Sequence, residues 1–180
     1  QPIEQLASLR MVPGLIVIRP ADANETVYAW KAALQQKGNP VALILTRQKI
    51  PVLNRTKLTS AEETEKGAYV ILDCSAEPDV IIMASGSEVF HAVEAFYVLQ
   101  SNGIKARVVS FPSWELFERI PQEYKDRVLL PDVLVRLAIE AGSPLGWEHY
   151  VGNRDAVIGM CEFGASAPGG TMMKQFGFTP

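Results

Sequence analysis

Arg47 stands in the stretch LTRQ, two residues beyond the apolar run Val41–Leu45, which has the length and composition of a buried strand. In open parallel sheets, ligands bind outside the carboxyl ends of the strands. A guanidinium at such an end carries a planar pair of N–H groups that matches a phosphate or a carboxylate. We therefore take Arg47 as a candidate anion-binding residue. The simpler alternative is an exposed arginine that begins a loop.

The segment SGSE at residues 85–88 leads from an apolar run into a helix-like pattern. Backbone N–H groups at the start of a helix can hold an anion. A capped turn, with Ser85 and Glu88 as a capping box, explains the same residues more simply. A single glycine does not make a phosphate loop, and the glycine patterns of P-loops and dinucleotide-binding folds are absent. We therefore interpret this segment as a capped helix start.

The two histidines lack the partners that metal or nucleophilic chemistry needs. His91 lies between Glu88 and Glu94 at helical spacing, which predicts a helix surface, and His149 follows Trp147 and Glu148. Neither histidine has the HExxH or HxH spacing of a metal site. No GxSxG nucleophile motif is present.

The remaining candidate groups favour structural roles. Glu140 ends a strand candidate, and we interpret it as an acid in a turn rather than as a carboxylate of a pocket or interface. Cys74 and Cys161 have no CxxC spacing and sit near apolar residues, which predicts two reduced, buried thiols rather than a disulfide or a metal site. The residues alone thus offer one anion-binding candidate and no complete active site.

The composition is that of a globular α/β protein. The chain has 180 residues, of which 48% are hydrophobic and 21% charged, with a net charge of −3. Without a basic patch or an apolar run of membrane-spanning length, we expect neither nucleic acid nor a membrane as a partner.

Strand-length apolar runs alternate with helical patterns along the chain. A run at residues 15–18, a helix begun by Asp22 with Glu25 three residues later, and the run Val41–Leu45 predict a strand, a helix and a parallel strand. The helix carries Ala23, Val27, Trp30 and Leu34 at helical spacing.

A polar stretch then separates this first part from a second α/β pattern. Further strands are expected at 69–72, 79–84, 106–110, 133–139 and 156–159, with helices from residue 88 to Gly103 and over 167–176. The predicted fold class is α/β: a three-layer, mixed, mostly parallel sheet with helices on both faces, preceded by a partial α/β domain. The predicted organisation is a partial domain at 1–50, a linker at 51–66 and a domain at 67–180.

Seven short motifs together resemble the carboxyl-terminal part of transketolases in their order and spacing. They are QPIEQLASLR at 1–10, IRPADANE at 18–25, ALILTRQKIP at 42–51, ASGSEV at 84–89, ARVVSFPS at 106–113, AIEAG at 138–142, and FGASAPGG with FGF within 163–178. The resemblance covers essentially the whole chain. It identifies residues 1–50 with the end of the family's pyrimidine-binding domain and residues 67–180 with its carboxyl-terminal domain.

The resemblance implies a function for the intact protein. Transketolases are homodimers that move a two-carbon ketol unit from a ketose phosphate to an aldose phosphate. They use thiamine diphosphate with Mg²⁺ or Ca²⁺ and serve the pentose phosphate pathway and the Calvin cycle. The implied location is the cytoplasm, or the plastid stroma in a photosynthetic eukaryote.

The resemblance also gives Arg47 a role. It matches the family's arginine in SRQ, which contacts the phosphate of the sugar; here the motif reads TRQ. The family's THQPIE motif would place its active-site histidine directly before Gln1. The metal ligands and the cofactor-binding residues match no position here. We therefore expect no cofactor, metal or catalytic residue on these 180 residues, and no activity from them alone.

Two alternatives stay open at this point. The chain could be a stand-alone, non-catalytic interaction or regulatory module. It could also belong to a related thiamine diphosphate enzyme, such as a deoxyxylulose phosphate synthase or a pyruvate dehydrogenase beta subunit, although LTRQ, FGASAP and FGF favour transketolase. In either case, a partial first domain is expected to expose apolar surface around Ile16, Val17, Leu43 and Leu45.

Overall fold

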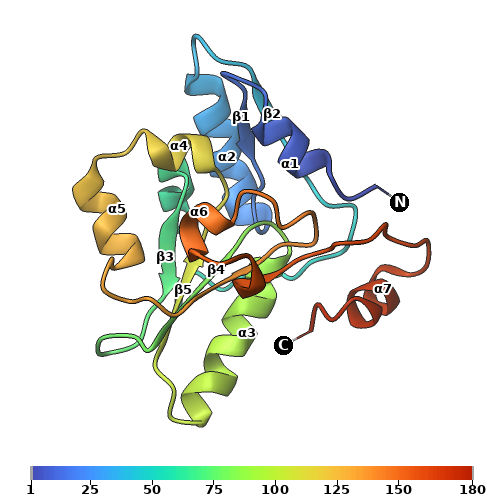
Figure 1. Cartoon of the computed structure of the whole chain (residues 1–180). Coiled ribbons are helices and arrows are strands. Elements are labelled where there is room, and N and C mark those ends of the chain that lie inside the picture. The colour runs from blue at the N-terminus through green and yellow to red at the C-terminus, as the bar shows by residue number, and fades with distance from the viewer. Residues whose placement is uncertain (1, 180) are drawn as a thin grey trace.

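Two sheets organise residues 2–179, which are the residues that this computed structural model describes (Figure 1). The first sheet pairs two parallel strands, β1 (Ile16–Ile18) and β2 (Val41–Leu43). The second sheet has the order β3-β5-β4-β6-β7. Its strands are β3 (Tyr69–Leu72), β4 (Val80–Ala84), β5 (Ala106–Ser110), β6 (Arg136–Ile139) and β7 (Val157–Ile158). Only β3 runs antiparallel to its neighbour among these described strands, so the predicted mixed, mostly parallel sheet is confirmed.

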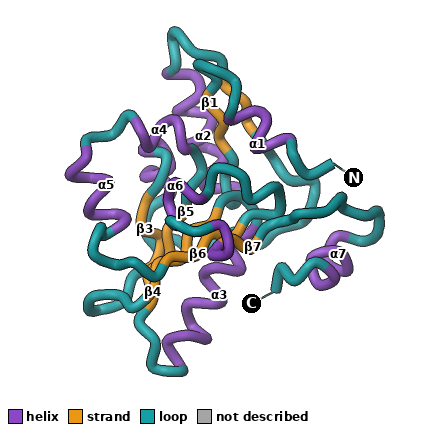
Figure 2. Tube along the Cα trace, viewed as in Figure 1, coloured by secondary structure: helices purple, strands orange, loops and turns teal. Residues whose placement is uncertain are grey.

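The helices lie between and around these strands (Figure 2). The α-helices are α1 (Gln5–Arg10), α2 (Ala23–Gln35), α3 (Glu88–Ser101), α4 (Trp114–Glu118), α5 (Gln122–Leu129), α6 (Glu148–Val151) and α7 (Gly169–Gln175). Two 3-10 helices, η1 (Ala61–Lys66) and η2 (Arg154–Ala156), complete the set. We call residues 2–50 the first unit and residues 67–179 the second unit. Gln1, the first residue of the first motif, and Pro180, the last residue of the expected second domain, lie outside the described residues.

The larger sheet is covered on both faces, as predicted. Alternate residues of β4 point to opposite sides because successive side chains of a strand alternate. Ile82 packs with Val89 and Phe96 of α3 in one core cluster. Ile81 and Met83 pack in the other cluster with side chains of α4, α5 and α6.

The start of α2 follows the predicted capping pattern in part. Asp22 Oδ1 accepts a hydrogen bond from the Glu25 N–H at 2.9 Å, which caps the helix. The Glu25 carboxylate accepts from the Ala21 N–H at 2.8 Å. A capping box would use the N–H of the cap residue itself, so Glu25 reaches one residue further back.

The buried face of α2 differs from the apolar stripe in the sequence. Ala29 and Ala32 are buried and pack against Ile16 and Ile18 of β1, together with Leu116 of α4. Val27, Trp30 and Leu34 are 65%, 53% and 79% exposed. Small alanines let the helix approach the strands closely, and the large side chains point away from the sheet.

The prediction that the first unit exposes apolar surface is right only near the end of β2. Ile16 and Val17 are buried, because α4 of the second unit covers β1. Leu43 is half-buried and Leu45 is 53% exposed. The second unit therefore supplies the cover that was expected to be missing for β1, but not for the end of β2.

The stretch 51–66, predicted as a polar linker, is anchored to both units. Leu53 is buried, and its N–H donates to Asp22 Oδ2 at 2.8 Å. Arg55 Nη1 donates to the Tyr69 hydroxyl at 2.8 Å, and the 3-10 helix η1 forms within this stretch.

Candidate functional site

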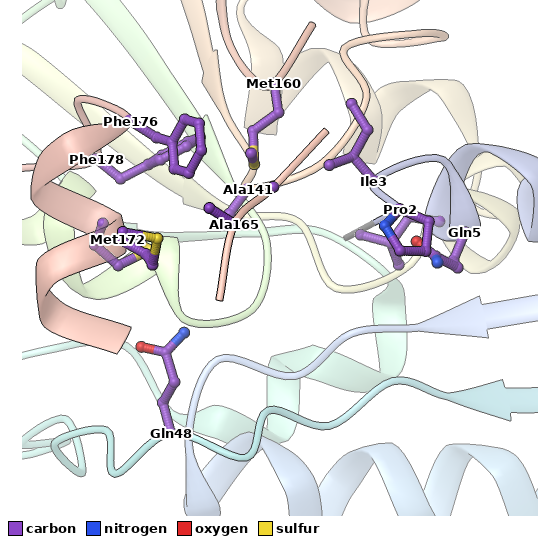
Figure 3. A pocket seen from close by; sticks show the side chains of 13 residues that line it. Pro2, Ile3, Gln5, Gln48, Ala141, Met160, Ala165, Met172, Phe176 and Phe178 are labelled. Atoms are coloured by element: carbon purple, nitrogen blue, oxygen red, sulfur yellow. The ribbon is translucent and has the colours of Figure 1, made fainter. Parts of the chain in front are cut away.

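Two adjoining cavities, each of about 250 Å³, lie between the units. Both are lined by Gln5, Leu6, Gln48 and Ala141, and we call the pair the inter-unit cleft. Figure 3 shows the cavity that extends toward α7, with Gln48 below Met172 and with Phe176 and Phe178 above Met172 in this view. The second cavity extends toward Arg19 and residues 86–88.

The cleft forms where several strands end. Residues 44–48 follow β2, residues 86–88 follow β4, and Ala141 comes two residues after β6. Carboxyl ends of parallel strands are where open α/β sheets bind ligands. Both sheets therefore direct such ends toward one cleft.

Arg47 lies next to this cleft but does not line it. The side chain is exposed, and among residues 2–179 it makes no hydrogen bond or ion pair, whereas the adjacent Gln48 lines both cavities. The Thr46 hydroxyl accepts from the Gln48 N–H at 3.1 Å and shapes the turn that carries Arg47. A serine hydroxyl can make the same contact, so TRQ keeps the local geometry of SRQ. The role of Arg47 stays a prediction.

Glu140, interpreted from the sequence as an acid in a turn, is a fully buried carboxylate; that interpretation was wrong. Arg10 Nη1 and Nη2 donate to its two oxygens at 2.7 and 2.8 Å. Trp147 Nε1 donates to Oε1 at 3.1 Å and the Ser85 hydroxyl to Oε2 at 2.5 Å. Burial by itself would raise the pKa of Glu140, but Arg10, with Arg19 and Ser85, lowers the pKa to about 2. Glu140 is thus an ionised link between the units.

Glu88 is a second correction, because no capping box with Ser85 forms. Glu88 is fully buried; its Oε2 accepts from Arg19 Nη1 at 2.6 Å and from the Ala141 N–H at 2.9 Å. Arg19 Nη1 also donates to the Ser85 carbonyl at 2.6 Å. Burial by itself would lower the pKa of Arg19, but the charges of Glu88 and Glu140 raise it. The SGSE turn is therefore occupied by an arginine of the first unit.

Gly86 makes this approach of Arg19 possible. Its φ is +58°, and a Cβ added there would lie 2.5 Å from the Arg19 Cζ. A side chain at position 86 would therefore collide with the guanidinium. The glycine that the sequence offered as weak evidence for an anion site instead makes room for a cation of the same chain.

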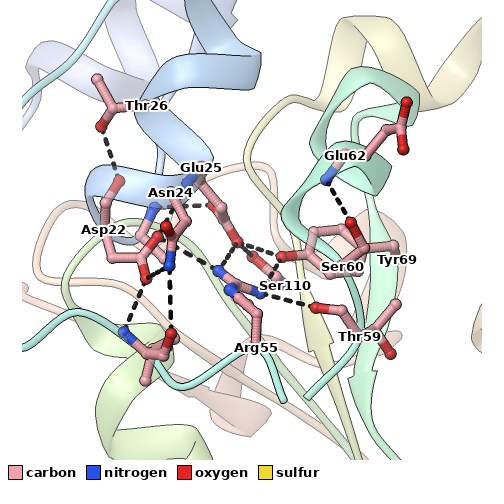
Figure 4. Close-up of polar contacts among 12 residues, drawn as sticks. Asp22, Asn24, Glu25, Thr26, Arg55, Thr59, Ser60, Glu62, Tyr69 and Ser110 are labelled. Atoms are coloured by element: carbon pink, nitrogen blue, oxygen red, sulfur yellow. Dashed lines mark hydrogen bonds and ion pairs between the residues drawn. The ribbon is translucent and has the colours of Figure 1, made fainter. Parts of the chain in front are cut away.

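A second buried network joins the units on another side (Figure 4). Glu25 Oε1 accepts from the Tyr69 hydroxyl at 2.6 Å and from the Ser110 hydroxyl at 2.7 Å, and Arg55 Nη2 lies 3.6 Å away. Arg55 Nη2 also contacts Asp22 Oδ1 at 3.3 Å. Burial raises the pKa of Glu25, although these hydrogen bonds and the Arg55 charge oppose the rise.

The histidines and cysteines do not join the cleft. His91 is half-buried on α3, where Nδ1 lies 3.5 Å from Glu94 Oε2, and His149 is exposed. The cysteines are free, but Cys161 is exposed and Cys74 half-buried, so the predicted burial was wrong. Sequence reasoning missed Arg10, Arg19 and Arg55 as buried partners of acids. One sequence feature could have pointed to these pairs: the seven motifs contain Arg10 and Arg19 together with Glu25, Glu88 and Glu140.

The described residues do not fit a metal site. No group of three or more His, Cys, Asp and Glu side chains within 2–179 could hold a metal ion. We therefore derive no step through a metal in this chain. Among the same residues, no helix has the length and hydropathy needed to cross a membrane.

Comparisons with known proteins give a consistent family. A family model described as the transketolase-like TK C-terminal domain matches residues 67–179, and one described as the transketolase pyrimidine binding domain matches residues 1–52. A transketolase of Aquifex aeolicus (strain VF5) is 53% identical over 180 residues, which is 100% of this chain and 26% of the relative. The chain thus spans about a quarter of the length of the curated relatives it matches.

Solved structures agree with this match. A transketolase of Pichia stipitis in complex with sedoheptulose 7-phosphate has a TM-score of 0.88 at 42% identity, over 99% of this chain and 25% of that chain. A split-gene transketolase, described as an inactive beta4 tetramer, has a TM-score of 0.76 at 25% identity, over 99% of this chain and 58% of that chain.

Proposed function

The chain belongs to the transketolase family, and from this premise we propose that it is the carboxyl-terminal portion of an enzyme that transfers a two-carbon ketol unit between phosphorylated sugars. In this proposal the complete enzyme is a cytoplasmic homodimer that uses thiamine diphosphate and a divalent metal ion. The described part contributes the cleft wall and Arg47, and it is inactive alone.

The position of the TRQ turn is the observation that carries this proposal. Arg47 is an exposed guanidinium without a partner among residues 2–179, four residues beyond the end of β2 and at the edge of the inter-unit cleft. A free guanidinium in that place can form a two-pronged, charge-assisted contact with a phosphate. The Pichia stipitis relative was solved with a sugar phosphate, sedoheptulose 7-phosphate, which supports this class of substrate.

The cofactor supplies the bond-making chemistry when bound: its thiazolium ring acts as the electron sink for the ketol unit. The residues described here bind and orient. Arg47 holds the phosphate end of the sugar, the Thr46 hydroxyl maintains the turn, and Gln48 lines the cleft with its amide. The inactivity of these residues alone is consistent with the split-gene relative, which is described as inactive.

The test replaces Arg47 in the full-length protein. Arg47→Ala removes a charge-assisted contact of about 1.5–3 kcal/mol, which lowers kcat/KM for phosphorylated donor and acceptor about 10- to 150-fold. Lys49→Ala is the matched control, because Lys49 is another exposed cation of the same loop. Unchanged kcat/KM in Arg47→Ala would remove the phosphate role. Absence of ketol transfer by the wild-type protein, supplied with thiamine diphosphate and Mg²⁺, would remove the proposed function itself.

A stand-alone interaction module is the second candidate, favoured by the extensive burial of charge between the units within residues 2–179. The mass of the naturally expressed protein, measured by mass spectrometry under denaturing conditions, separates the two candidates. A mass near 19.8 kDa would favour the module, and a mass several times larger would favour the enzyme.

A further inference from the structure

Helix α1 is attached to the second unit at both of its ends. At its start, the Ile3 carbonyl accepts from the Ser143 N–H at 3.0 Å. At its end, the Arg10 guanidinium makes the two-pronged contact with Glu140 and lies 3.8 Å from the centre of the Trp114 ring. Both attachments come from the segment 140–143, directly after β6, and from the aromatic side chains around it.

The residues between these attachments form a wall of the inter-unit cleft. Gln5 and Leu6 line both of its cavities, and Leu6 Cδ1 would lie 3.5 Å from a Cβ added at Gly142. The helix is only six residues long, so it has little stability of its own. Leu6 and Ala7 bury one face of the helix, and the contacts at its two ends fix its orientation.

Glu140 also connects to the opposite wall. The Ser85 hydroxyl donates to its Oε2, and the Ser85 carbonyl accepts from Arg19. Arg19 and Glu88 line the cavity on that side, and Glu88 accepts from the Ala141 N–H. The two walls are thus joined through one carboxylate.

A buried ion pair is weak evidence for stability, because the cost of removing both charges from water offsets much of their attraction. A bidentate arginine–carboxylate pair does fix distance and angle, since both N–H groups must meet both oxygens. This geometry suits the setting of an orientation better than the addition of stability.

We propose that Glu140 is a positioning residue for substrate binding: through Arg10 it fixes α1 and so sets the cleft at whose edge Arg47 meets the phosphate. This inference rests on the proposed function. It gives the second unit, which supplies no catalytic residue among 67–179 in our proposal, a defined part in the reaction. Glu140 acts through α1 and does not touch the substrate.

The experiment uses the full-length enzyme with thiamine diphosphate and Mg²⁺ and measures kcat and KM for a ketose phosphate and an aldose phosphate, the affinity for thiamine diphosphate, and Tm. Glu140→Gln is expected to raise both KM values about tenfold, because it loosens α1 without displacing it by the full ~1 Å that can cost about 100-fold. Its kcat and its affinity for thiamine diphosphate should stay within about twofold of wild type.

Glu25→Gln is the matched control, because Glu25 is also a fully buried acid between the units, but the hydrogen bonds of its carboxylate go to Ala21, Tyr69 and Ser110 and none reaches α1. It should lower Tm and leave KM unchanged. Equal rises of KM in Glu140→Gln and Glu25→Gln would reduce Glu140 to a general structural role and overturn the proposal.

Arg10→Lys decides the question if Glu140→Gln does not fold. Lysine keeps the charge but loses the two-pronged contact. The KM values should therefore rise as for Glu140→Gln, while Tm should decrease only slightly. A wild-type KM in Arg10→Lys would overturn the proposal. An active wild type with unaffected variants removes only the positioning role, whereas an inactive wild type removes the proposed function as well.

Discussion

The Tyr69 hydroxyl is the group at which the second inter-unit network can be tested most cleanly. Tyr69 is 1% exposed, donates to Glu25 Oε1 at 2.6 Å and accepts from Arg55 Nη1 at 2.8 Å. Tyr69→Phe removes only this oxygen and keeps the ring, so it opens no large cavity. Two charge-assisted hydrogen bonds are lost, each of which contributes about 1.5–3 kcal/mol.

Glu25 keeps its contacts from Ser110 and from the Ala21 N–H, so the loss stays near the lower end of that sum, at about 3 kcal/mol. Near the midpoint, 1 kcal/mol shifts the Tm of a chain of this size by about 2–4 °C. The expected decrease in Tm is therefore about 6–12 °C, and denaturant unfolding should give the same loss of free energy with an unchanged m-value.

The effect should also depend on pH. Burial raises the pKa of Glu25 above its ordinary value, and the Tyr69 hydrogen bond opposes the rise. Without the hydroxyl, the pKa rises further. A carboxyl whose pKa is raised on folding contributes its stability below the unfolded pKa and loses it as pH rises through the folded pKa. Tyr69→Phe should therefore be more destabilising at about pH 8 than at about pH 5.

Tyr124→Phe is the matched control, because its hydroxyl makes only longer contacts, 3.2 Å to the Ala68 carbonyl and 3.3 Å to Glu63, at a half-buried position. It should cost less than about 1 kcal/mol. Equal losses in the two variants, or a Tyr69→Phe loss that does not change with pH, would refute the reasoning that a buried, ionisable Glu25 makes this contact strong.

Two further outcomes follow from local geometry. Gly67→Ala should destabilise the chain by about 3 kcal/mol in denaturant unfolding, because Gly67 has φ +81° and an added Cβ would lie 2.3 Å from the Phe117 backbone nitrogen. Gly103→Ala, at φ +77° with open space around it, should cost only about 1 kcal/mol. Equal costs of the two substitutions would contradict the steric argument. Cys161, which is exposed, should react with a thiol reagent well before half-buried Cys74, whose Sγ contacts the Ala76 carbonyl at 2.9 Å. Equal labelling rates of the two cysteines, followed by mass spectrometry, would contradict that order.

The alternation of apolar runs was enough to predict the sheet. The runs at 69–72, 79–84 and 106–110 became β3, β4 and β5 almost without change. A continuous apolar run is typical of a strand in a sheet that is buried on both faces, which is where these strands lie. The helical period of α2 was also right, but the face was wrong: Val27 and Trp30 are exposed, and Ala29 is buried. Periodicity reports the geometry of an element, and the face that is buried depends on its neighbours.

The buried acids could not be predicted from local patterns. The partners Glu140 and Arg10 are 130 residues apart in sequence, and Arg19 and Glu88 are 69 apart. A carboxylate beside a turn is usually solvated, and only its distant partner makes burial tolerable. Arg47 is the opposite case, since its candidate role follows from its position at a strand end and needs no partner within residues 2–179.

The direction in which the charges cross between the units explains why their relative orientation should be well defined. Arg10 and Arg19 extend from the first unit to the acids Glu140 and Glu88 of the second. Glu25 extends the other way, to hydroxyl groups of the second unit. A purely apolar contact can slide with little loss, whereas a slide here would leave carboxylates and guanidinium groups buried without partners, at several kcal/mol each. The arrangement of the two units therefore behaves as a single state, and the cleft beside Arg47 inherits that definition.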